Sequence, residues 1–460
     1  MSSTRVRFAP SPTGMMHIGN TRTALFNWLF ARNTGGTFVL RIEDTDVVRH
    51  MDEALEVIFD GFGWLGMDWD EGPEVGGPYG PYFQSQRAEY YKEHAERLMG
   101  ESQAYVCTCQ ESSHQDCRCG EADDRQLREG VAVRFRNPGG TTGYEDMVKG
   151  SLTFEDEVFG DFILLKSDGM PTYNFANVVD DHLMKITHVI RGDDHVSNTP
   201  RQIMIYRALG YKPPLFAHLP QILGEDGKRL SKRHGAVALT EYRNQGFLPQ
   251  GMMNYLALLG WSPKGEEELL TPDQLVEKFR LEDVRPSPAM FRLDKLMWIN
   301  AHHLEMLEPA EKVSLIKGVL EERQLLPEGA GDEWLGEVIE AFGSRLKYAA
   351  QILDYGDYFF QDDISIPEDL EFRLESPAVL RALAAVAENL ESLEPWTDEA
   401  IEEVVRAAAK EHDLKAGEVI HGIRASVSGK AVGPSLFSLV RLVGKERVVS
   451  RLRRAVEVRT

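Results

Sequence analysis

One stretch near the start of the chain carries residue types that suit a phosphate site. Residues 7–20 read RFAPSPTGMMHIGN, with two prolines, two glycines and an imidazole. Gly14 and Gly19 allow a backbone or a nucleotide to approach closely, and His17 can donate a hydrogen bond to a phosphate oxygen. A rigid proline turn with a capping histidine gives the same pattern, so this stretch alone leaves both interpretations open.

A second stretch, residues 224–235, reads GEDGKRLSKRHG and holds four basic residues among six consecutive positions. Flexible lysine and arginine side chains suit a polyphosphate because they can follow negative charge as it develops on a leaving group. Taken alone, the stretch also fits a solvated surface loop.

The third candidate is a cluster of all four cysteines: Cys107, Cys109, Cys117 and Cys119. They form two Cys-x-Cys arms separated by seven residues. With no secretory signal ahead of them, these arms favour a soft metal over disulfides, and four thiolates suit tetrahedral zinc. Reduced thiols or a redox pair are the alternatives.

The first phosphate-like stretch lies between elements that would position it. Residues 4–9 alternate like a short strand, residues 21–33 have helical periodicity, and residues 37–42 predict the next strand. The three make a βαβ unit. Ligands of an open parallel sheet bind beyond the carboxyl ends of its strands, where helix N-terminal N–H groups favour anions. We therefore expect residues 10–20 at such an edge.

Later segments supply a second half of this sheet. Residues 186–191 predict a buried strand, residues 199–209 a helix, and residues 219–223 a strand that leads into the basic stretch. Between the halves, residues 100–185 contain the cysteines and several β-like runs, which indicates an insertion. From about residue 309 onward the periodicity is helical.

Composition limits the classes of function. With 460 residues, 42% of them hydrophobic, the chain is expected to form two to four domains. Its formal net charge of −22 argues against indiscriminate nucleic-acid binding, although local basic patches can still hold a nucleic acid. One candidate patch is Arg447, Arg451, Arg453 and Arg454 on the predicted final helix, residues 444–458, with a solvated face as the alternative. The chain shows no apolar leader, spanning run or apolar seam, which predicts a cytoplasmic monomer.

Together, the two phosphate-like stretches resemble the HIGH and KMSKS motifs that bracket ATP in class I aminoacyl-tRNA synthetases. The chain is further similar to the bacterial glutamyl-tRNA synthetase family in four segments: residues 7–14, 41–46, 171–182 and 230–235. The similarity runs from about residue 5 to about residue 300 and continues more weakly through the helical tail.

The resemblance implies an α/β fold: a Rossmann-like class I catalytic domain with an inserted α+β acceptor-binding domain and an all-α C-terminal anticodon-binding region. The expected boundaries are residues 1–99 and 186–240 for the catalytic halves, 100–185 for the insertion, 241–308 for a stem-contact domain and 309–460 for the anticodon-binding region. Arg345 lies near where relatives read an anticodon base, and an ordinary solvent-exposed arginine is the alternative.

The resemblance also implies a ligase that joins L-glutamate to tRNA-Glu in two steps. ATP activates glutamate as an adenylate in a tRNA-dependent step, and the glutamyl group then passes to the terminal ribose of the tRNA, with Mg²⁺ assisting. Catalytic roles fall on His17, Arg229 and Lys232. Contacts to ATP fall on His17, Gly19, Asn20, Leu230, Ser231 and Lys232.

Recognition of glutamate needs a group that distinguishes a carboxylate from an amide. A guanidinium group forms two parallel hydrogen bonds with a carboxylate and mismatches an amide, so arginine is the expected reader. The resemblance assigns this role to Arg7 and Arg191 and completes the pocket with Ala9, Ser11, Glu43, Tyr173 and Asn177. It also implies a structural zinc on the four cysteines, as in the zinc-bearing branch of the family.

Two positions depart from the class pattern and keep alternatives open. Asn20 stands where the first motif has histidine, and Arg229 stands where the second motif has lysine. A tRNA-binding paralogue with impaired catalysis is therefore a second hypothesis. A glutaminyl or non-discriminating enzyme is a third, although Arg191 is out of place in glutaminyl enzymes. A ligase that modifies a tRNA nucleoside is a fourth, although such relatives resemble only the catalytic half.

Overall fold

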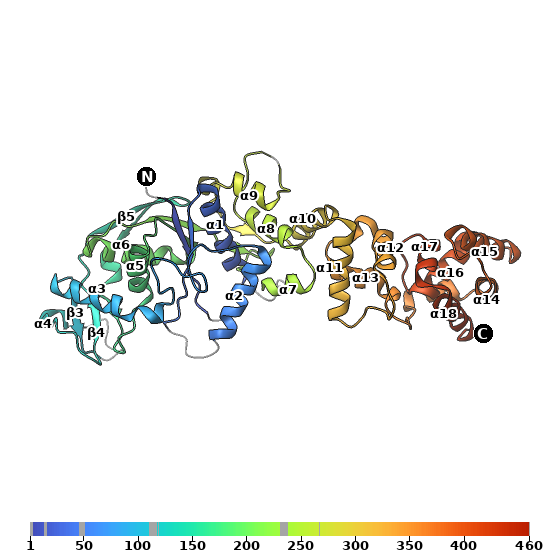
Figure 1. Ribbon diagram of the computed structural model, residues 1–460, viewed down its shortest axis with the longest axis horizontal. Coiled ribbons are helices and arrows are strands. Elements are labelled where there is room, and N and C mark those ends of the chain that lie inside the picture. Colours follow the sequence, from blue (N-terminus) through green and yellow to red (C-terminus); the bar gives the residue numbers. More distant parts are fainter. Residues whose placement is uncertain are drawn as a thin grey trace. The chain divides into compact units, whose positions relative to one another are not determined.

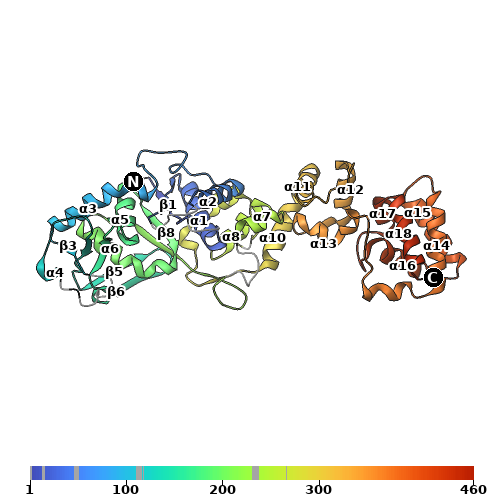
Figure 2. The same ribbon diagram turned by 90° about the horizontal axis from the view of Figure 1, so that it is seen from below.

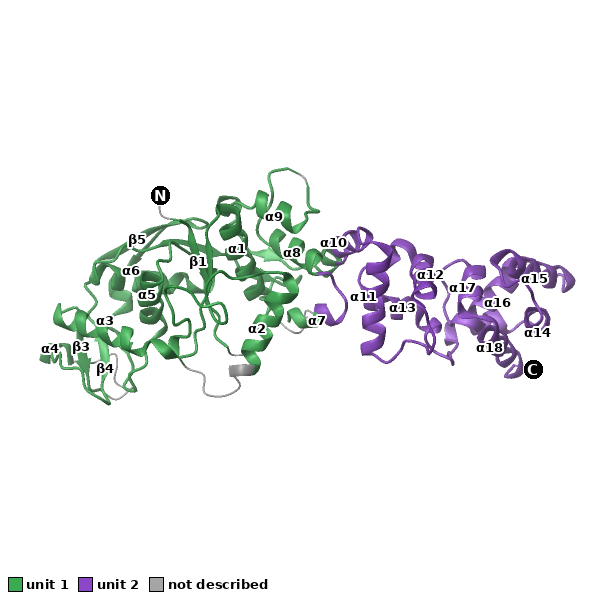
Figure 3. Cartoon of the chain, viewed as in Figure 1, with its two compact units in different colours: residues 1–241, 249–296 green, residues 242–248, 297–460 purple. Residues whose placement is uncertain are grey.

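The computed structural model describes residues 3–12, 16–45, 51–109, 117, 119–230, 238–265 and 267–459. These residues form two compact units (Figure 3). Unit 1 contains residues 1–241 and 249–296, and unit 2 contains residues 242–248 and 297–460. Each unit has its own hydrophobic core, so each is described by itself.

The N-terminal βαβ unit of unit 1 is confirmed (Figure 1). Strand β1 (Arg5–Phe8) pairs in parallel with β2 (Thr37–Leu40), and α1 (Ile18–Thr34) connects them. Helix α1 begins one turn earlier than predicted and ends at Gly35, whose φ of 60° is left-handed. Its side chains are buried on several faces and not on one stripe, because the rest of unit 1 packs around it.

A four-stranded mixed sheet stands beside this βαβ unit. Its order is β6-β5-β9-β8, formed by β5 (Thr141–Asp146), β6 (Gly150–Glu155), β8 (His188–Gly192) and β9 (Leu215–Leu219). Strands β8 and β9 are parallel, as predicted. Figure 2 shows β1 near β8, and the backbone N–H of Thr187 donates to the carbonyl of Arg5 at 2.9 Å. The hairpin β5–β6, although part of the predicted insertion, thus extends the catalytic sheet.

The remainder of the insertion is an antiparallel sheet packed on helices. Strands β3 (Ala104–Cys107), β4 (Ala132–Phe135) and β7 (Phe162–Leu165) lie in the order β3-β4-β7. They share a core with three helices, which are α3 (Ala88–Gly100), α5 (Tyr173–Leu183) and α6 (Thr199–Ala208). The short helix α4 (Cys119–Ala122) and the 3-10 helices η1 (Gln84–Arg87), η3 (Asp156–Phe159) and η4 (Asp193–Asn198) complete this region.

Local structure in unit 1 departs from simple sequence patterns at three places. Ser85, a residue type that often caps helices, does not cap α3: it lies within η1, and its N–H and hydroxyl both donate to the carboxylate of Asp44. The predicted strand 219–223 is interrupted, because β9 ends at Leu219 and Pro220 has no N–H to continue the ladder. Residues 61–66 read GFGWLG, a GxGxxG pattern, but they lie in and just after α2 (Met51–Leu65) and do not connect a strand to a helix, so they are not a dinucleotide loop.

The remaining elements of unit 1 follow the basic stretch. Strand β10 (Ile222–Leu223) pairs in parallel with β11 (Ala289–Met290). Around them are α8 (Pro249–Leu258), α9 (Pro272–Lys278) and η6 (Leu281–Asp283). Two helices, α7 (Leu239–Asn244) and α10 (Leu293–Glu305), each contain a boundary between the units.

Unit 2 is helical throughout its described residues, as predicted. Its helices are α11 (Pro309–Glu322), α12 (Asp332–Phe342), α13 (Ile352–Gly356), α14 (Pro377–Glu391), α15 (Asp398–Glu411), α16 (Ala416–Ser428), α17 (Leu436–Val443) and α18 (Lys445–Glu457). The 3-10 helices are η7 (Gly343–Arg345), η8 (Ala349–Gln351), η9 (Asp357–Phe359) and η10 (Glu368–Leu374). One continuous apolar core joins them.

The prediction that the arginines of the final helix form a phosphate-binding patch is wrong for Arg451. Its side chain is buried and donates to the backbone carbonyls of Val427 and Tyr358, at 2.6 and 3.0 Å. Arg453 and Arg454 pair with carboxylates, and Arg447 donates to a backbone carbonyl. Arg451 therefore belongs to the interior of unit 2, whereas the ion pairs of Arg453 and Arg454 lie on its surface. Within the described part of the chain, none of the helices has the length and apolar character to span a membrane.

Candidate active site

A cavity of about 770 Å³ opens in unit 1 where the segments after β1, β2, β8 and β9 converge. The predicted site residues that line it are Arg7, Ala9, Ser11, His17, Gly19, Asn20, Glu43, Tyr173, Arg191, Arg229 and Leu230. The sheet edge predicted from the βαβ pattern is therefore the edge that carries the cavity.

The start of α1 and the ends of the basic stretch meet at this cavity. His17 lies exposed, just before α1, in an extended conformation with φ of −75°. It forms a β-bridge with Ala238, and the N–H of Leu239 donates to the carbonyl of Met16 at 3.1 Å. Leu230 also lines the cavity. The two predicted phosphate-binding segments are thus neighbours, while Ser231 and Lys232 themselves lie outside the described residues.

Arg7 approaches the cavity from β1 and is held by a buried carboxylate. Its Nε donates to Asp181 at 3.2 Å, and Arg41 donates to the same carboxylate at 2.6 Å. Burial raises the pKa of Asp181, but the charges of Arg7 and Arg41 outweigh it and hold that pKa below its usual value. Among the described residues, the hydrogen bonds of Arg7 use only Nε, which leaves both terminal nitrogens for a ligand.

Glu43 and Asn177 occupy different layers of the site. Glu43 lines the cavity, and burial raises the pKa of its carboxyl although Arg41 and Arg7 oppose that shift. Asn177 is 1% exposed, accepts from Arg41 at 2.8 Å and donates to the carbonyl of Tyr173 at 3.1 Å. It is not among the residues that line the cavity, so its place is behind Tyr173 and Arg41.

Arg191 extends from β8 and is fixed along one edge. Its Nε donates to His218 at 3.1 Å and its Nη2 donates to Thr199 at 2.7 Å. Its Nη1 has only a long contact, 3.5 Å, to the hydroxyl of Tyr173. The ring of Tyr173 in turn stacks on His195 with 5.2 Å between centroids. Arg7 and Arg191 are therefore two buried guanidinium groups that line one cavity.

Several functional-site residues escaped the sequence analysis. Arg41 and Asp181 form the buried layer behind Arg7, and Asp180 continues it by accepting from Arg87 at 2.6 Å. The available signal was the pair of acids in α5, a helix whose surrounding residues are largely apolar. Arg22 was also missed: it lines the cavity, and its side chain donates to the carbonyls of Pro220 and Leu259.

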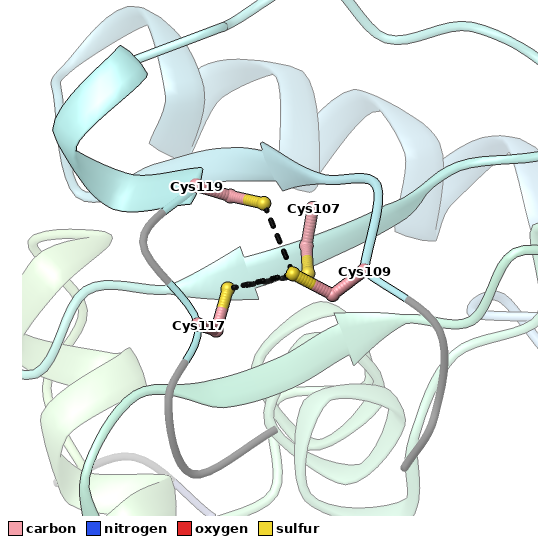
Figure 4. Close-up of side chains that lie close together, drawn as sticks. All are labelled: Cys107, Cys109, Cys117 and Cys119. Carbon is pink, nitrogen blue, oxygen red and sulfur yellow. Dashed lines mark hydrogen bonds between the residues drawn. The ribbon is translucent and has the colours of Figure 1, made fainter. Parts of the chain in front are cut away.

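The four cysteines converge at the end of β3 (Figure 4). All four Sγ atoms lie within 4.8 Å of one another, and the Cys109 Sγ is 3.5 Å from Cys117 and 3.3 Å from Cys119. Tetrahedral zinc with Zn–S bonds of about 2.3 Å needs sulfurs about 3.8 Å apart. Burial raises the pKa of Cys107 to about 12, while a hydrogen bond from the backbone of Thr108 lowers the pKa of Cys119 to about 6. The donor set and its spacing fit a zinc ion.

Arg345 lies in unit 2, in η7, where it is exposed. Both interpretations of Arg345, a contact to the anticodon and an ordinary surface arginine, require an exposed side chain, so its exposure favours neither.

Comparison with known proteins covers nearly the whole chain. Residues 3–298 match the catalytic domain of class I tRNA synthetases for E and Q (glutamate and glutamine), and residues 303–456 match an anticodon-binding domain. The chain is 43% identical over 481 residues to the glutamate–tRNA ligase of Moorella thermoacetica, covering 99% of this chain and 98% of that protein. It is 41% identical over 472 residues to the glutamate–tRNA ligase of Geobacter sulfurreducens, covering 99% of each.

A solved structure shares this fold. The crystal structure of a glutamate tRNA ligase from Elizabethkingia meningosepticum, in complex with its amino acid, matches with a TM-score of 0.86 and 32% identity over 100% of both chains. The predicted fold class, an α/β catalytic domain followed by a helical C-terminal region, is confirmed.

Proposed function

The chain belongs to the class I tRNA synthetases for glutamate and glutamine, and from this premise we propose that it is a glutamate–tRNA ligase acting on L-glutamate, ATP and tRNA-Glu. The observation that carries the proposal is the pair Arg7 and Arg191, two buried guanidinium groups in the cavity that His17 and the start of α1 also border. Such a pair reads a carboxylate next to a site for phosphates.

The chemistry needs positioned charges and no protein nucleophile. An oxygen of the α-carboxylate of glutamate bonds to the α-phosphorus of ATP. The bond from this phosphorus to the oxygen that bridges the α- and β-phosphates breaks, which releases pyrophosphate. The terminal ribose hydroxyl of the tRNA then attacks the acyl carbon, AMP leaves, and the hydroxyl proton passes to solvent. His17, Arg229 and Lys232 stabilise negative charge on the phosphates. Mg²⁺ that arrives with ATP supplies further charge neutralisation.

The pocket favours glutamate over glutamine through its hydrogen-bond donors. The free terminal nitrogens of Arg7 and the Nη1 of Arg191 can donate to both side-chain oxygens of glutamate. The amide group of glutamine would place N–H donors against these donors, an unfavourable contact in a buried site. The carboxylate of Glu43 suits the substrate's ammonium group.

We assign the cysteines a structural zinc ion. Cys107, Cys109, Cys117 and Cys119 would hold it, and its bonds would rigidify the insertion near β3 and α4. Elemental analysis of freshly purified protein kept under reducing agent should give about one zinc per chain, and the variant Cys119→Ser should bind less. Protein without zinc under these conditions would contradict the assignment.

Roles in tRNA binding follow from the domain boundaries proposed from the sequence. The insertion, residues 100–185, would receive the acceptor end, residues 241–308 the stem, and residues 309–460 the anticodon. Arg345 is a candidate for anticodon contact because it is exposed in unit 2. We propose a cytoplasmic, monomeric enzyme.

The test is ATP–pyrophosphate exchange with glutamate, measured with and without tRNA-Glu. The proposal expects exchange only when tRNA is present. Exchange without tRNA would favour a ligase that modifies a tRNA nucleoside, and no exchange under either condition would favour a tRNA-binding paralogue. Exchange with glutamine at a similar kcat/KM would contradict the roles of Arg7 and Arg191. The variant Lys232→Ala should lose exchange while its affinity for tRNA stays nearly unchanged.

A further inference from the structure

A buried histidine stands directly behind the glutamate-reading arginine of β8. Arg191 and His218 are register partners on the adjacent strands β8 and β9, so their side chains lie on the same side of the sheet. The Arg191 Nε lies 3.1 Å from the His218 Nε2. His218 is 0% exposed and does not line the cavity, so it contacts the arginine but not a ligand.

The other face of this imidazole is held by a buried carboxylate. The His218 Nδ1 lies 2.6 Å from Asp146 Oδ2, at the end of β5. The second oxygen of Asp146 accepts from the backbone N–H groups of Val148 and Lys149, at 3.0 and 2.8 Å. Asp146 is therefore anchored by the β5–β6 turn, and its orientation does not depend on His218 alone.

These contacts determine which nitrogen of His218 carries the proton. Burial raises the pKa of Asp146, but hydrogen bonds from His218 and the backbone outweigh it and lower that pKa, so Asp146 is an ionised acceptor. Burial lowers the pKa of His218, so its imidazole is neutral. A carboxylate can only accept, which places the proton on Nδ1 and leaves Nε2 as an acceptor for the Nε–H of Arg191.

We propose that Asp146 and His218 are positioning residues for glutamate recognition: together they fix the guanidinium plane of Arg191 so that its Nη1 faces the side-chain carboxylate of the substrate. The inference rests on the proposed function. The Nε and Nη2 of Arg191 are occupied by His218 and Thr199, which leaves Nη1 for the ligand. Arg7 is held in the same manner, with Asp181 on its Nε.

The substitution Asp146→Asn tests this arrangement with little change of shape. The amide oxygen can keep the backbone hydrogen bonds, but the amide NH₂ would donate to Nδ1 of His218 and move the imidazole proton to Nε2. The new Nε2–H of His218 would then face the Nε–H of Arg191, and the Thr199 hydroxyl, 3.1 Å from Nε2, would be left as its acceptor in place of a bond to Arg191. We expect the KM for glutamate to rise roughly 10- to 100-fold, the KM for ATP to stay within twofold, and the preference for glutamate over glutamine to fall.

A matched control is Asp156→Asn, since Asp156 is also buried in the insertion but accepts from Thr142 and does not line the cavity. Its KM for glutamate should stay unchanged. The variant His218→Phe, which removes the acceptor, should raise the KM for glutamate, and His218→Gln should largely restore it because an amide can donate to Asp146 and accept from Arg191. The double variant Asp146→Asn/His218→Phe should resemble His218→Phe alone, since both act through one hydrogen bond.

A spectroscopic measurement keeps the inference testable if a variant loses activity. The ¹⁵N shifts of His218 should show a neutral ring protonated on Nδ1 in the unaltered chain and on Nε2 in Asp146→Asn. A proton on Nε2 in the unaltered chain would overturn the inference, as would an unchanged KM for glutamate in both Asp146→Asn and His218→Phe. If the unaltered chain shows no glutamate-dependent ATP–pyrophosphate exchange, the proposed function itself is contradicted. Failure of the inference and failure of the proposed function are therefore distinguishable.

Discussion

At the scale of single residues, the cavity of unit 1 depends on charges that are buried but paired. Arg41 is fully buried and lies 2.6 Å from Asp181, which also accepts from Arg7 at 3.2 Å. Loss of Asp181 would be costly because Arg7 would lose its carboxylate partner in a low-dielectric interior, while Arg41 would keep only the more distant Asp180 and Glu43, at 3.8 and 3.7 Å. The network therefore orients Arg7 and offsets the cost of burying its charge.

The variant Asp181→Asn should expose this dependence. The amide keeps the shape but removes the charge opposite Arg7 and Arg41, and we expect the free energy of unfolding to fall by about 3–5 kcal/mol. Urea denaturation at neutral pH measures the loss. The variant Asp156→Asn is a useful comparison because Asp156 is equally buried but forms no ion pair in the described structure. Equal losses for the two variants would contradict the role of the charge network.

The pH dependence of this difference has a definite sign. The pKa of Asp181 lies below its ordinary value of 3.8 in the folded chain. A carboxyl group with a lowered pKa contributes stability that is present above the unfolded value and is lost as pH falls toward the folded value. The gap in stability between the unaltered chain and Asp181→Asn should therefore be constant near neutral pH and shrink below about pH 4. A gap that widens in acid would refute this assignment.

Residues whose chemistry is local were the ones that the sequence could identify. Arg7, His17, Glu43 and Arg191 carry functional groups in recognisable segments, and all four line the cavity. Asp146 and His218 could not be found in this way, because their role arises only when β5, β8 and β9 pair in space. Sequence separation hides such contacts: Asp146 and His218 are 72 positions apart.

At the scale of elements, Arg22 connects the start of α1 to two later segments. Its side chain donates to the carbonyls of Pro220, just after β9, and Leu259, just after α8. Burial lowers the pKa of Arg22 to about 10, partly opposed by the charge of Asp193, so it remains a cation near neutral pH. This contact joins α1 to the backbone at the ends of β9 and α8.

Replacing Arg22 by methionine should weaken this connection. The two carbonyls would lose their donor, and we expect the free energy of unfolding to fall by about 1–3 kcal/mol, since release of a buried cation offsets part of the loss. Urea denaturation measures the change. Arg22→Lys keeps the charge and one donor group, so its free energy of unfolding should lie between that of the unaltered chain and that of Arg22→Met. Unchanged stability in Arg22→Met would show that the contact contributes nothing.

Gly246 gives a comparable case in unit 2. Its φ is +74°, and a Cβ atom there would lie 2.4 Å from the Cβ of Ala349. Gly246→Ala should therefore destabilise unit 2 through both backbone strain and overpacking, by about 2–4 kcal/mol in a thermal or urea melt. Gly329→Ala is the matched control, because Gly329 has a φ of +77° but no atom within 4 Å of its added Cβ. Equal effects would mean that the contact with Ala349 is easily relieved.

Elements with strong periodicity were predicted well, and their interruptions less so. Strand β8 and helix α6 follow from apolar runs of ordinary length, whereas the break at Pro220 was passed over within an otherwise apolar stretch. The error for Arg451 has the same origin. Helical spacing placed it off the apolar side, but the backbone carbonyls of Val427 and Tyr358 supply polar partners that allow an arginine to be buried.

At the scale of the whole molecule, net charge and domain division act together. A chain with a formal net charge of −22 repels a polyanion on average, so binding of tRNA must depend on local groups. The KMSKS-like stretch supplies one such local concentration of charge. The described residues that line the cavity all belong to unit 1.

This division predicts how the chain unfolds. Two units with separate cores should give two calorimetric transitions, and ATP or glutamate, each alone at a hundredfold excess over its Kd, should stabilise only unit 1, by about 2.7 kcal/mol. The two transitions can be assigned independently. Asp181→Asn should lower the transition temperature of unit 1 only, and Gly246→Ala should lower that of unit 2 only. A single transition that both variants and both ligands move together would instead mean that the two units unfold cooperatively.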